Sequence, residues 1–421
     1  MSIFKKTFGE YLLLFIFSLI IVFIYFLIFK NTCSNKIMSL QEQEQKQEQE
    51  HMFNLQYTQP SKEQVVPKWN RAKCDYTMNT TILDELKSNG IEQSDKDWNV
   101  YLPCGYDYIN KEIEQLPIVN NAKYFIISDA DEMVAKEMLW KHMVNHYGLI
   151  ITQTMMPNSF ILYDTLERLR FDKDFDKDKI YIMKKNIQRQ EGLKISKDKN
   201  EILNGYKEGY VVVQELLQDP YIINGRKTNM RFYVLVVCVN KRLQVYVHKD
   251  GFMYYTKVPF IKNNTEVDVN ITTGYIDRKV YDENPLTHDD LRKYLDDPNR
   301  TNLLTIEKNI RSQHLNISDI YFNRINQLLK QIFMAFVGRI CMSDKLLKNI
   351  SFQLFGVDIA VNDKLHPMIM EINKGPDLGA KDKKDSALKH GVVKDMFAVV
   401  KIINADTSKF IQILDTSNIK E

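Results

Sequence analysis

Residues 11–29 constrain this chain most, because these nineteen residues carry no formal charge and are rich in Leu, Ile and Phe. A helix of that length matches the hydrocarbon core of a bilayer. A cleaved signal peptide is the alternative, but it would need a shorter apolar stretch and a small-residue cleavage site, and neither is evident after Lys30. The sequence therefore predicts a single-pass membrane protein anchored by residues 1–30.

A polar tract follows the anchor. Residues 41–50 alternate Gln with Glu and one Lys, and they offer nothing apolar to bury. We interpret residues 31–67 as a flexible or partly helical stalk. Aromatic and branched residues return after Pro67, and we expect an N-terminal α/β subdomain at 68–165 and a larger domain at 166–421.

Composition excludes several classes of protein. The formal net charge of +3 is small beside 57 basic and 54 acidic residues, so it gives no indication of a nucleic-acid partner. The five cysteines are odd in number and scattered, without a CxxC pair, so neither a disulfide scaffold nor a zinc site is expected. Cys238 lies in an apolar run and is interpreted as a small buried hydrophobe.

Apolar periodicity predicts an α/β (α+β) fold. A helix is expected at residues 131–147, and another at 386–400. Strands are expected at residues 122–128, 181–184 and 210–217, and antiparallel hairpins at 230–239 with 243–248 and at 352–361 with 367–373.

The second of these hairpins carries polar residues within apolar strands. Asp358 interrupts one strand, and Glu371 and Asn373 interrupt the other. Glu371 and Asn373 share a face, and one permitted register places Asp358 directly across from Glu371. Such hard oxygen ligands suit Mg²⁺. The alternatives are a solvent-facing strand or carboxylates satisfied by nearby lysines.

Three basic residues suggest an anion site. Lys184 ends a predicted strand, Lys227 follows Gly225-Arg226, and Arg231 precedes a run of apolar residues. Taken alone, each lysine favours interpretation as a surface charge, because lysine is rarely buried. Arg231 lies at the edge of an apolar strand, where it can bind a phosphate or carboxylate through two hydrogen bonds.

Other chemistries lack support in the sequence. It contains no GxxxxGK[ST] loop, no GxGxxG fingerprint, no GxSxG elbow and no HExxH. His142 and His146 are four residues apart on the predicted helix, but without a third ligand they do not predict a metal site.

Several short motifs occur in a particular order: NHYG at 145–148, MPNSFIL at 156–162, YIMK at 181–184, VVQ at 212–214, GRKTNMR at 225–231, KDG at 249–251, ITT at 271–273, FGVD at 355–358 and MEINKGP at 370–376. Their order resembles the tubulin–tyrosine ligase family, including its polyglutamylases, whose catalytic core is an ATP-grasp fold. The resemblance covers roughly residues 122–400.

This resemblance implies a role for each candidate residue. Lys184 and Lys227 would hold ATP phosphates, and Arg231 would face the reacting phosphoryl group. Asp358, Glu371 and Asn373 would bind Mg²⁺. Asn229 would lie near the ribose, while Thr272 and Lys389, both weaker matches, would lie near the nucleotide or substrate. The adenine would lie in the interdomain hinge against Gln214, Glu215, Leu216 and Leu217.

Five departures from the family pattern concern the phosphate lid and substrate recognition, and the first is Lys185 in place of a Pro. Glu191 stands in the altered lid loop, Asn229 replaces an Asp that binds ribose, Tyr254 replaces an Arg, and Thr273 replaces an Asn. We expect an active but divergent ligase that joins an amino acid, glutamate favoured, to a protein carboxylate through an acylphosphate. A membrane-tethered pseudoenzyme that binds nucleotide or an acidic tail is the alternative.

The expected partners are a protein with an acidic tail, tubulin favoured, and a free amino acid. Lysines flank the apolar segment on both sides and give no orientation, so the cytosolic side is expected because ATP and tubulin are there. Asn270 begins a glycosylation sequon that would report a lumenal location. Removing Asp358 or Glu371 is expected to abolish ligation with little loss of stability, because the two carboxylates would repel each other.

Overall fold

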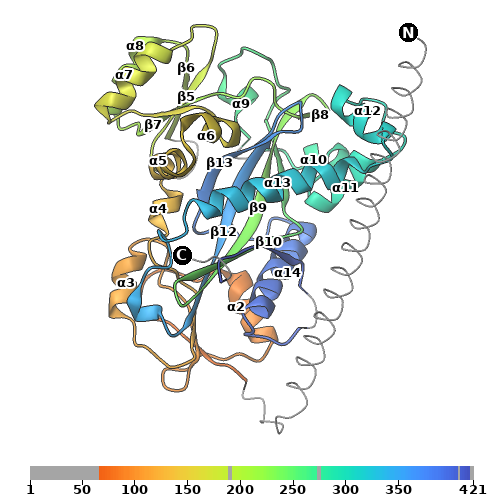
Figure 1. Cartoon of the computed structure of the whole chain (residues 1–421). Helices are drawn as coiled ribbons and strands as arrows, with labels where there is room; N and C mark the ends of the chain where they lie inside the picture. Colours follow the sequence, from red (N-terminus) through yellow and green to blue (C-terminus); the bar gives the residue numbers. More distant parts are fainter. Residues whose placement is uncertain (1–65, 188–191, 273–275, 406–407, 418–421) are drawn as a thin grey trace, which may run out of the picture. The chain divides into compact units, whose positions relative to one another are not determined.

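The computed structural model describes residues 66–187, 192–272, 276–405 and 408–417. Val66–Glu421 forms one compact unit (Figure 1). The predicted anchor and almost all of the predicted stalk lie outside the described residues. Within the described ranges, no helix is both long enough and apolar enough to cross a bilayer.

Two sheets organise the described part of the chain. The strands are β1 (Trp69–Asn70), β2 (Val100–Tyr101), β3 (Lys123–Tyr124), β4 (Ser159–Ile161), β5 (Tyr181–Lys184), β6 (Leu193–Ser196), β7 (Val212–Glu215), β8 (Ile222–Ile223), β9 (Arg226–Val239), β10 (Arg242–His248), β11 (Phe252–Tyr255), β12 (Ile350–Val361), β13 (Pro367–Asn373) and β14 (Phe410–Asp415). The larger sheet has the order β1-β2-β3-β12-β9-β10-β14, with β13 on β12 and with β8 and β11 on β9. The smaller sheet has the order β4-β7-β5-β6.

Helices cover both sheets. They are α2 (Thr80–Ser88), α3 (Ile109–Gln115), α4 (Asp131–Val134), α5 (Lys136–Tyr147), α6 (Leu149–Met155), α7 (Thr165–Asp174), α8 (Lys199–Asn204), α9 (Val267–Asn270), α10 (Val280–Glu283), α11 (His288–Asp296), α12 (Thr305–Ser312), α13 (Ile317–Met334) and α14 (Lys383–Val399), with 3-10 turns η2 (Gly205–Glu208) and η3 (Asp344–Leu346). Figure 1 shows α13 crossing the central strands and α7 and α8 beside the smaller sheet.

The long strand β9 is apolar on both faces because it runs through the middle of the core. Phe232, Val234 and Val236 pack into the cluster that contains α13, whereas Tyr233 and Leu235 pack into the cluster that contains α14. Side chains of a strand alternate between the two faces of its sheet, so a continuous apolar run is what a strand covered on both sides requires. This strand carries Lys227, Asn229 and Arg231 near its beginning.

Most predicted elements are confirmed, with shifted ends. The hairpins β9–β10 and β12–β13 are antiparallel as expected, and α14 occupies the place of the last predicted helix. The prediction of one continuous helix at residues 131–147 was wrong. Ala135 is extended (ψ 125°) and separates α4 from α5. The strand predicted at residues 122–128 is reduced to β3.

The prediction about the cysteines was wrong. Cys74 pairs with Cys104 and Cys238 with Cys341, each with the two Cα atoms 5.8 Å apart. The sequence separations of 30 and 103 residues conceal both pairs, because spatial proximity across a sheet leaves no mark in spacing. Cys238 is buried as expected, but as half of a cystine. Cys33 lies outside the described residues.

Candidate active site

A cavity of about 640 Å³ lies between the smaller sheet and the β9–β12–β13 part of the larger sheet. Cavities of this size hold small molecules and cofactors. Eleven of the twelve candidate residues line it: Lys184, Glu215, Leu216, Leu217, Lys227, Asn229, Arg231, Thr272, Asp358, Glu371 and Asn373. Gln214 is buried in β7 behind the lining residues, and its Oε1 has no hydrogen-bond partner among the described residues.

The hairpin register agrees with the prediction. Asp358 on β12 lies directly opposite Glu371 on β13, and Asn373 follows on the same strand. The Nδ2 of Asn373 donates to Oε1 of Glu371 at 3.1 Å, and this leaves the amide oxygen of Asn373 for another partner. A register shift follows Asp358, so strand alternation is interrupted just beyond this pair.

Arg231 holds the carboxylate of Asp358. Its Nε donates to Oδ1 at 2.5 Å and its Nη2 donates to Oδ2 at 3.0 Å. The pair is possible because β9 lies on the other side of β12, where Arg231 is opposite Asp358. Burial raises the pKa of Asp358 above its ordinary value, and the attraction of Arg231 opposes that rise.

This ion pair argues against the expectation that removing Asp358 costs little stability. A buried arginine that loses its carboxylate is left as an uncompensated charge. Glu371 is compensated differently, because Lys136 and Lys184 attract its charge and Asn373 donates a hydrogen bond. Burial raises the pKa of Glu371, but these three groups together lower it below its ordinary value.

Two buried lysines face the cavity from different sheets. Lys184 ends β5 and is 7% exposed, and Lys227 begins β9 and is 4% exposed. Burial lowers the pKa of Lys184 to about 8. Burial and the charge of Lys184 lower the pKa of Lys227 to about 7. Among the described residues neither lysine forms a close ion pair; Glu371 and Asp219 act on them only from a greater distance, and a polyanion in the cavity would supply closer partners.

Buried polar atoms around the cavity also lack partners. Among the described residues, none is within hydrogen-bonding distance of Asn229 Oδ1, Asn270 Oδ1 or Thr272 Oγ1. All three residues line the cavity. Buried polar groups normally make hydrogen bonds, so these three atoms indicate a site that is completed by a polar ligand.

The hinge segment supplies the apolar part of the site. Leu216 packs with Ile180 and Ile182, and Ile271 packs against the same cluster. The amide of Leu217 makes no hydrogen bond among the described residues, and its carbonyl accepts from Lys227 Nζ at 3.2 Å. A flat heterocycle could lie between these aliphatic side chains and hydrogen-bond to the exposed backbone.

The oxygen ligands fit a magnesium ion. Asp358, Glu371 and the amide oxygen of Asn373 are hard donors, and Mg²⁺ usually takes one or two carboxylates with phosphates and waters completing its shell. In the described part of the chain, no three His, Cys, Asp or Glu residues form a metal cluster. Two carboxylates and one amide oxygen are consistent with an ion whose remaining ligands come from a phosphate and waters.

Sequence reasoning assigned no site role to several residues of the cavity. Lys136 begins α5 and lies close enough to Glu371 to lower the pKa of that carboxyl. Gly375, Asp377 and Lys381 line the cavity from the segment after β13. No local sequence pattern indicates Lys136, whereas Gly375, Asp377 and Lys381 come within eight residues after Asn373. Lys389, the weaker match, is buried and donates to the carbonyl of Gly379 at 2.6 Å, and it is not a lining residue.

Comparison with known proteins agrees with this site. A sequence model of the Tubulin-tyrosine ligase family matches residues 121–409, more than half of the chain. The chain therefore belongs to the tubulin–tyrosine ligase family. Its candidate nucleotide and metal residues all fall within the matched segment.

The similar proteins include tubulin polyglutamylases. A probable beta-tubulin polyglutamylase of Tetrahymena thermophila is 22% identical over 54% of this chain and 19% of its own length. Human tubulin polyglutamylase TTLL6 is 20% identical over 76% of this chain and 35% of its own. A probable tubulin polyglutamylase TTLL9 of Rattus norvegicus is 27% identical over 46% of this chain and 39% of its own. The chain thus spans well under half the length of these curated relatives.

Proposed function

We propose that this protein is an ATP-dependent carboxylate–amine ligase with an ATP-grasp core, in which ATP lies between the two sheets. The observation that carries the proposal is the convergence of Lys184, Lys227 and the Asp358–Glu371 pair on one cavity. In this proposal the lysines bind phosphates, the hinge binds adenine, and the polar atoms of Asn229 and Thr272 gain partners. A bound Mg²⁺ would neutralise phosphate charge beside Asp358, Glu371 and Asn373.

The reaction proposed is a two-step ligation. A carboxylate oxygen of the acceptor protein attacks the γ-phosphorus of ATP, ADP leaves, and an acylphosphate forms. The amine of the amino acid then attacks the acyl carbon, phosphate leaves, and an amide bond results. The chain's own contribution is positioning and charge: the two lysines face the phosphates, Arg231 lies beside the reacting groups, and the walls of the cavity limit water.

The favoured acceptor is an acidic protein tail, and the names of the relatives make tubulin the first acceptor to test. Glutamate is the favoured added amino acid. Lys136 and Lys381 line the cavity in addition to the two phosphate lysines, and they could attract carboxylates. This proposal is tested by incubating residues 66–421 with MgATP, tubulin-tail peptides and each amino acid. Mass spectrometry should detect an ATP-dependent added residue, and no added mass with any amino acid would contradict the proposal.

A binding protein without activity is the second candidate. Tyr254 replaces the family's Arg, and its ring lies 5.5 Å from the guanidinium carbon of Arg231. Both oxygens of Asp358 are already bonded to Arg231. If these contacts persist with nucleotide bound, ATP would bind without transfer. Nucleotide binding without ligation or acylphosphate formation would favour this second candidate.

We further propose that residues 11–29 anchor the protein in a membrane, with the catalytic unit on the cytosolic side. The two cystines oppose the cytosolic side, since cystines persist mainly in oxidising compartments. The Asn270 sequon cannot report the side, because Asn270 is 2% exposed and its Nδ2 donates to two carbonyls. Three other sequons begin at exposed residues, Asn263, Asn299 and Asn316.

These exposed sequons give the orientation experiment. The native protein is treated with glycosidase, and its cysteines are labelled with a thiol reagent before and after reduction. A cytosolic unit should show no glycosidase-sensitive mass. Glycans on Asn263, Asn299 or Asn316, together with cysteines that label only after reduction, would place the unit on the lumenal side and remove tubulin as its acceptor in the cell.

A further inference from the structure

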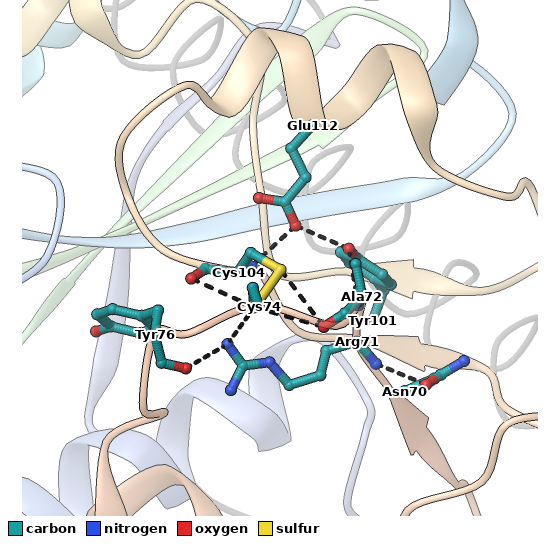
Figure 2. The surroundings of a disulfide bond; sticks show 8 residues. All are labelled: Asn70, Arg71, Ala72, Cys74, Tyr76, Tyr101, Cys104 and Glu112. Carbon is teal, nitrogen blue, oxygen red and sulfur yellow. Dashed lines mark hydrogen bonds between the residues drawn. A yellow bond between two sulfur atoms is a disulfide. The ribbon is translucent and has the colours of Figure 1, made fainter.

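The cystine between Cys74 and Cys104 lies in a part of the chain that precedes the family match at residue 121. It joins the segment after β1 to the segment after β2 (Figure 2). Cys74 is exposed and Cys104 half-buried, whereas Cys238 and Cys341 are 4% and 5% exposed. The first cystine is therefore the one that a reductant in solution can reach.

Hydrogen bonds fix both segments that carry this cystine. Arg71 donates through Nη2 to the carbonyl of Tyr76 at 2.8 Å. Glu112 accepts from the Cys104 amide at 2.9 Å and from the Tyr101 hydroxyl at 2.7 Å (Figure 2). Each half-cystine is followed, two residues later, by a tyrosine: Tyr76, whose carbonyl Arg71 holds, after Cys74, and Tyr106 after Cys104, whose own amide Glu112 holds.

The two tyrosines meet at the back of the active-site wall. Their rings contact edge to face, with centroids 6.1 Å apart. The ring of Tyr106 lies against Gly375, where a built Cβ would be 2.6 Å from its Cδ2. Position 375 therefore has no room for a side chain while Tyr106 is in place. Gly375 itself lines the cavity and follows Asn373 by two residues.

Other contacts hold residues 374–378 from different directions. Lys374 forms an ion pair with Asp131. The Tyr233 hydroxyl donates to the carbonyl of Asp377 at 3.4 Å, and Thr81 Oγ1 donates to the carbonyl of Leu378 at 2.8 Å. These contacts fix the two ends of the segment, and the ring of Tyr106 supports the middle of it. Displacing the ring would free this segment next to the Asn373 ligand.

We propose that Tyr106 is a positioning residue for the segment 374–378, and that the Cys74–Cys104 cystine makes its support sensitive to redox state. The expected effect on Mg²⁺ and ATP binding rests on the proposed function. The expected effect on the position of residues 374–378 does not. In the redox step a dithiol such as dithiothreitol transfers two electrons and two protons to the cystine. Two thiols form, and the dithiol becomes its cyclic disulfide.

The position of the segment is measured by amide hydrogen exchange in the full chain, purified in detergent. Peptides covering residues 373–379 should exchange faster in Tyr106→Ala than in the parent. They should be unchanged in Tyr106→Phe, which keeps the ring. Parent protein treated with dithiothreitol needs no substitution, so it remains informative if Tyr106→Ala does not fold. It should also exchange faster over these residues.

The consequence for the site is measured as the Mg²⁺ concentration that gives half of the ATP-induced rise in Tm. Groups that orient metal ligands typically change metal affinity by 10-fold or more, so we expect Tyr106→Ala to raise this concentration about 10-fold. Tyr106→Phe should match the parent. Dithiothreitol should shift the parent in the same direction by a smaller factor, and this readout requires no ligation.

Two paired variants separate the cystines. Cys74→Ser/Cys104→Ser should resemble the reduced parent and should not respond to dithiothreitol. Cys238→Ala/Cys341→Ala should still respond like the parent.

Unchanged exchange over residues 373–379 in both Tyr106→Ala and the reduced parent would overturn the positioning role. A persisting response in Cys74→Ser/Cys104→Ser would overturn the redox part. A parent without any ATP-induced rise in Tm would overturn the proposed function, while hydrogen exchange would still decide the role of Tyr106.

Discussion

Asp358 and Arg231 are joined by two hydrogen bonds across neighbouring strands, in a place where water has little access. The pair lies at the centre of the candidate site, beside Glu371. It links the chemistry of the site to the stability of the β9–β12 part of the sheet. A substitution at Asp358 therefore tests structure and function together, and the two effects must be separated.

The first prediction is that Asp358→Ala unfolds at lower denaturant than the parent. Breaking a buried ion pair by removing one partner typically costs about 3–5 kcal/mol, because the remaining charge is left unpaired. The double variant Arg231→Met/Asp358→Leu should recover much of that loss, because both charges are gone. Chemical denaturation of residues 66–421 measures both. Equal stability of Asp358→Ala and the parent would show that the ion pair contributes nothing.

The second prediction concerns Glu371, which is the better test of the magnesium site. Glu371→Gln keeps the shape of the side chain and can still accept from Asn373, so we expect a Tm close to that of the parent. It loses a carboxylate ligand, so the Mg²⁺ requirement for ATP binding should rise about 10-fold or more. Calorimetric titration with ATP over a series of Mg²⁺ concentrations measures this. An unchanged Mg²⁺ requirement would remove Glu371 from the metal site.

The structure explains why parts of the site could be predicted and parts could not. Asp358 and Glu371 belong to one hairpin, so strand alternation allowed their pairing as one permitted register, which the structure then shows. The Arg231–Asp358 pair depends on β9 lying beside β12, and the two residues are 127 positions apart. Both cystines and Lys136 are likewise products of distant packing. The break between α4 and α5 at Ala135 could not be predicted, because no glycine or proline lies there.

The third prediction is a pH dependence of MgATP binding. Lys227 has a pKa of about 7 without ligand, and a bound phosphate would raise that pKa by favouring the cation. Affinity should be full below pH 7 and should fall as the pH rises from that value toward the pKa of the complex, by up to about tenfold per pH unit for this lysine. Lys227→Arg stays charged and should lose this part of the slope. Identical slopes in titration calorimetry would contradict the assignment.

The fourth prediction concerns acceptor choice. Tyr254 and Asn229 lie opposite each other on β11 and β9, and both line the cavity. They replace residues of the family pattern, so we expect Tyr254→Arg/Asn229→Asp to change the ranking of acidic peptides in a competition assay. The matched control is Tyr254→Phe, which keeps the ring over Arg231. Identical acceptor and amino-acid profiles for the double variant and the parent would exclude a recognition role.

The most direct test of the account is chemical trapping of the activated carboxylate. Residues 66–421 are incubated with MgATP, an acidic peptide and hydroxylamine, without any amino acid, so the unknown identity of the amino acid does not matter. We predict a peptide hydroxamate that requires ATP and is lost in Glu371→Gln. If ATP binds to the parent and no hydroxamate forms with any acidic peptide, the protein does not activate carboxylates and the proposed ligase function is wrong.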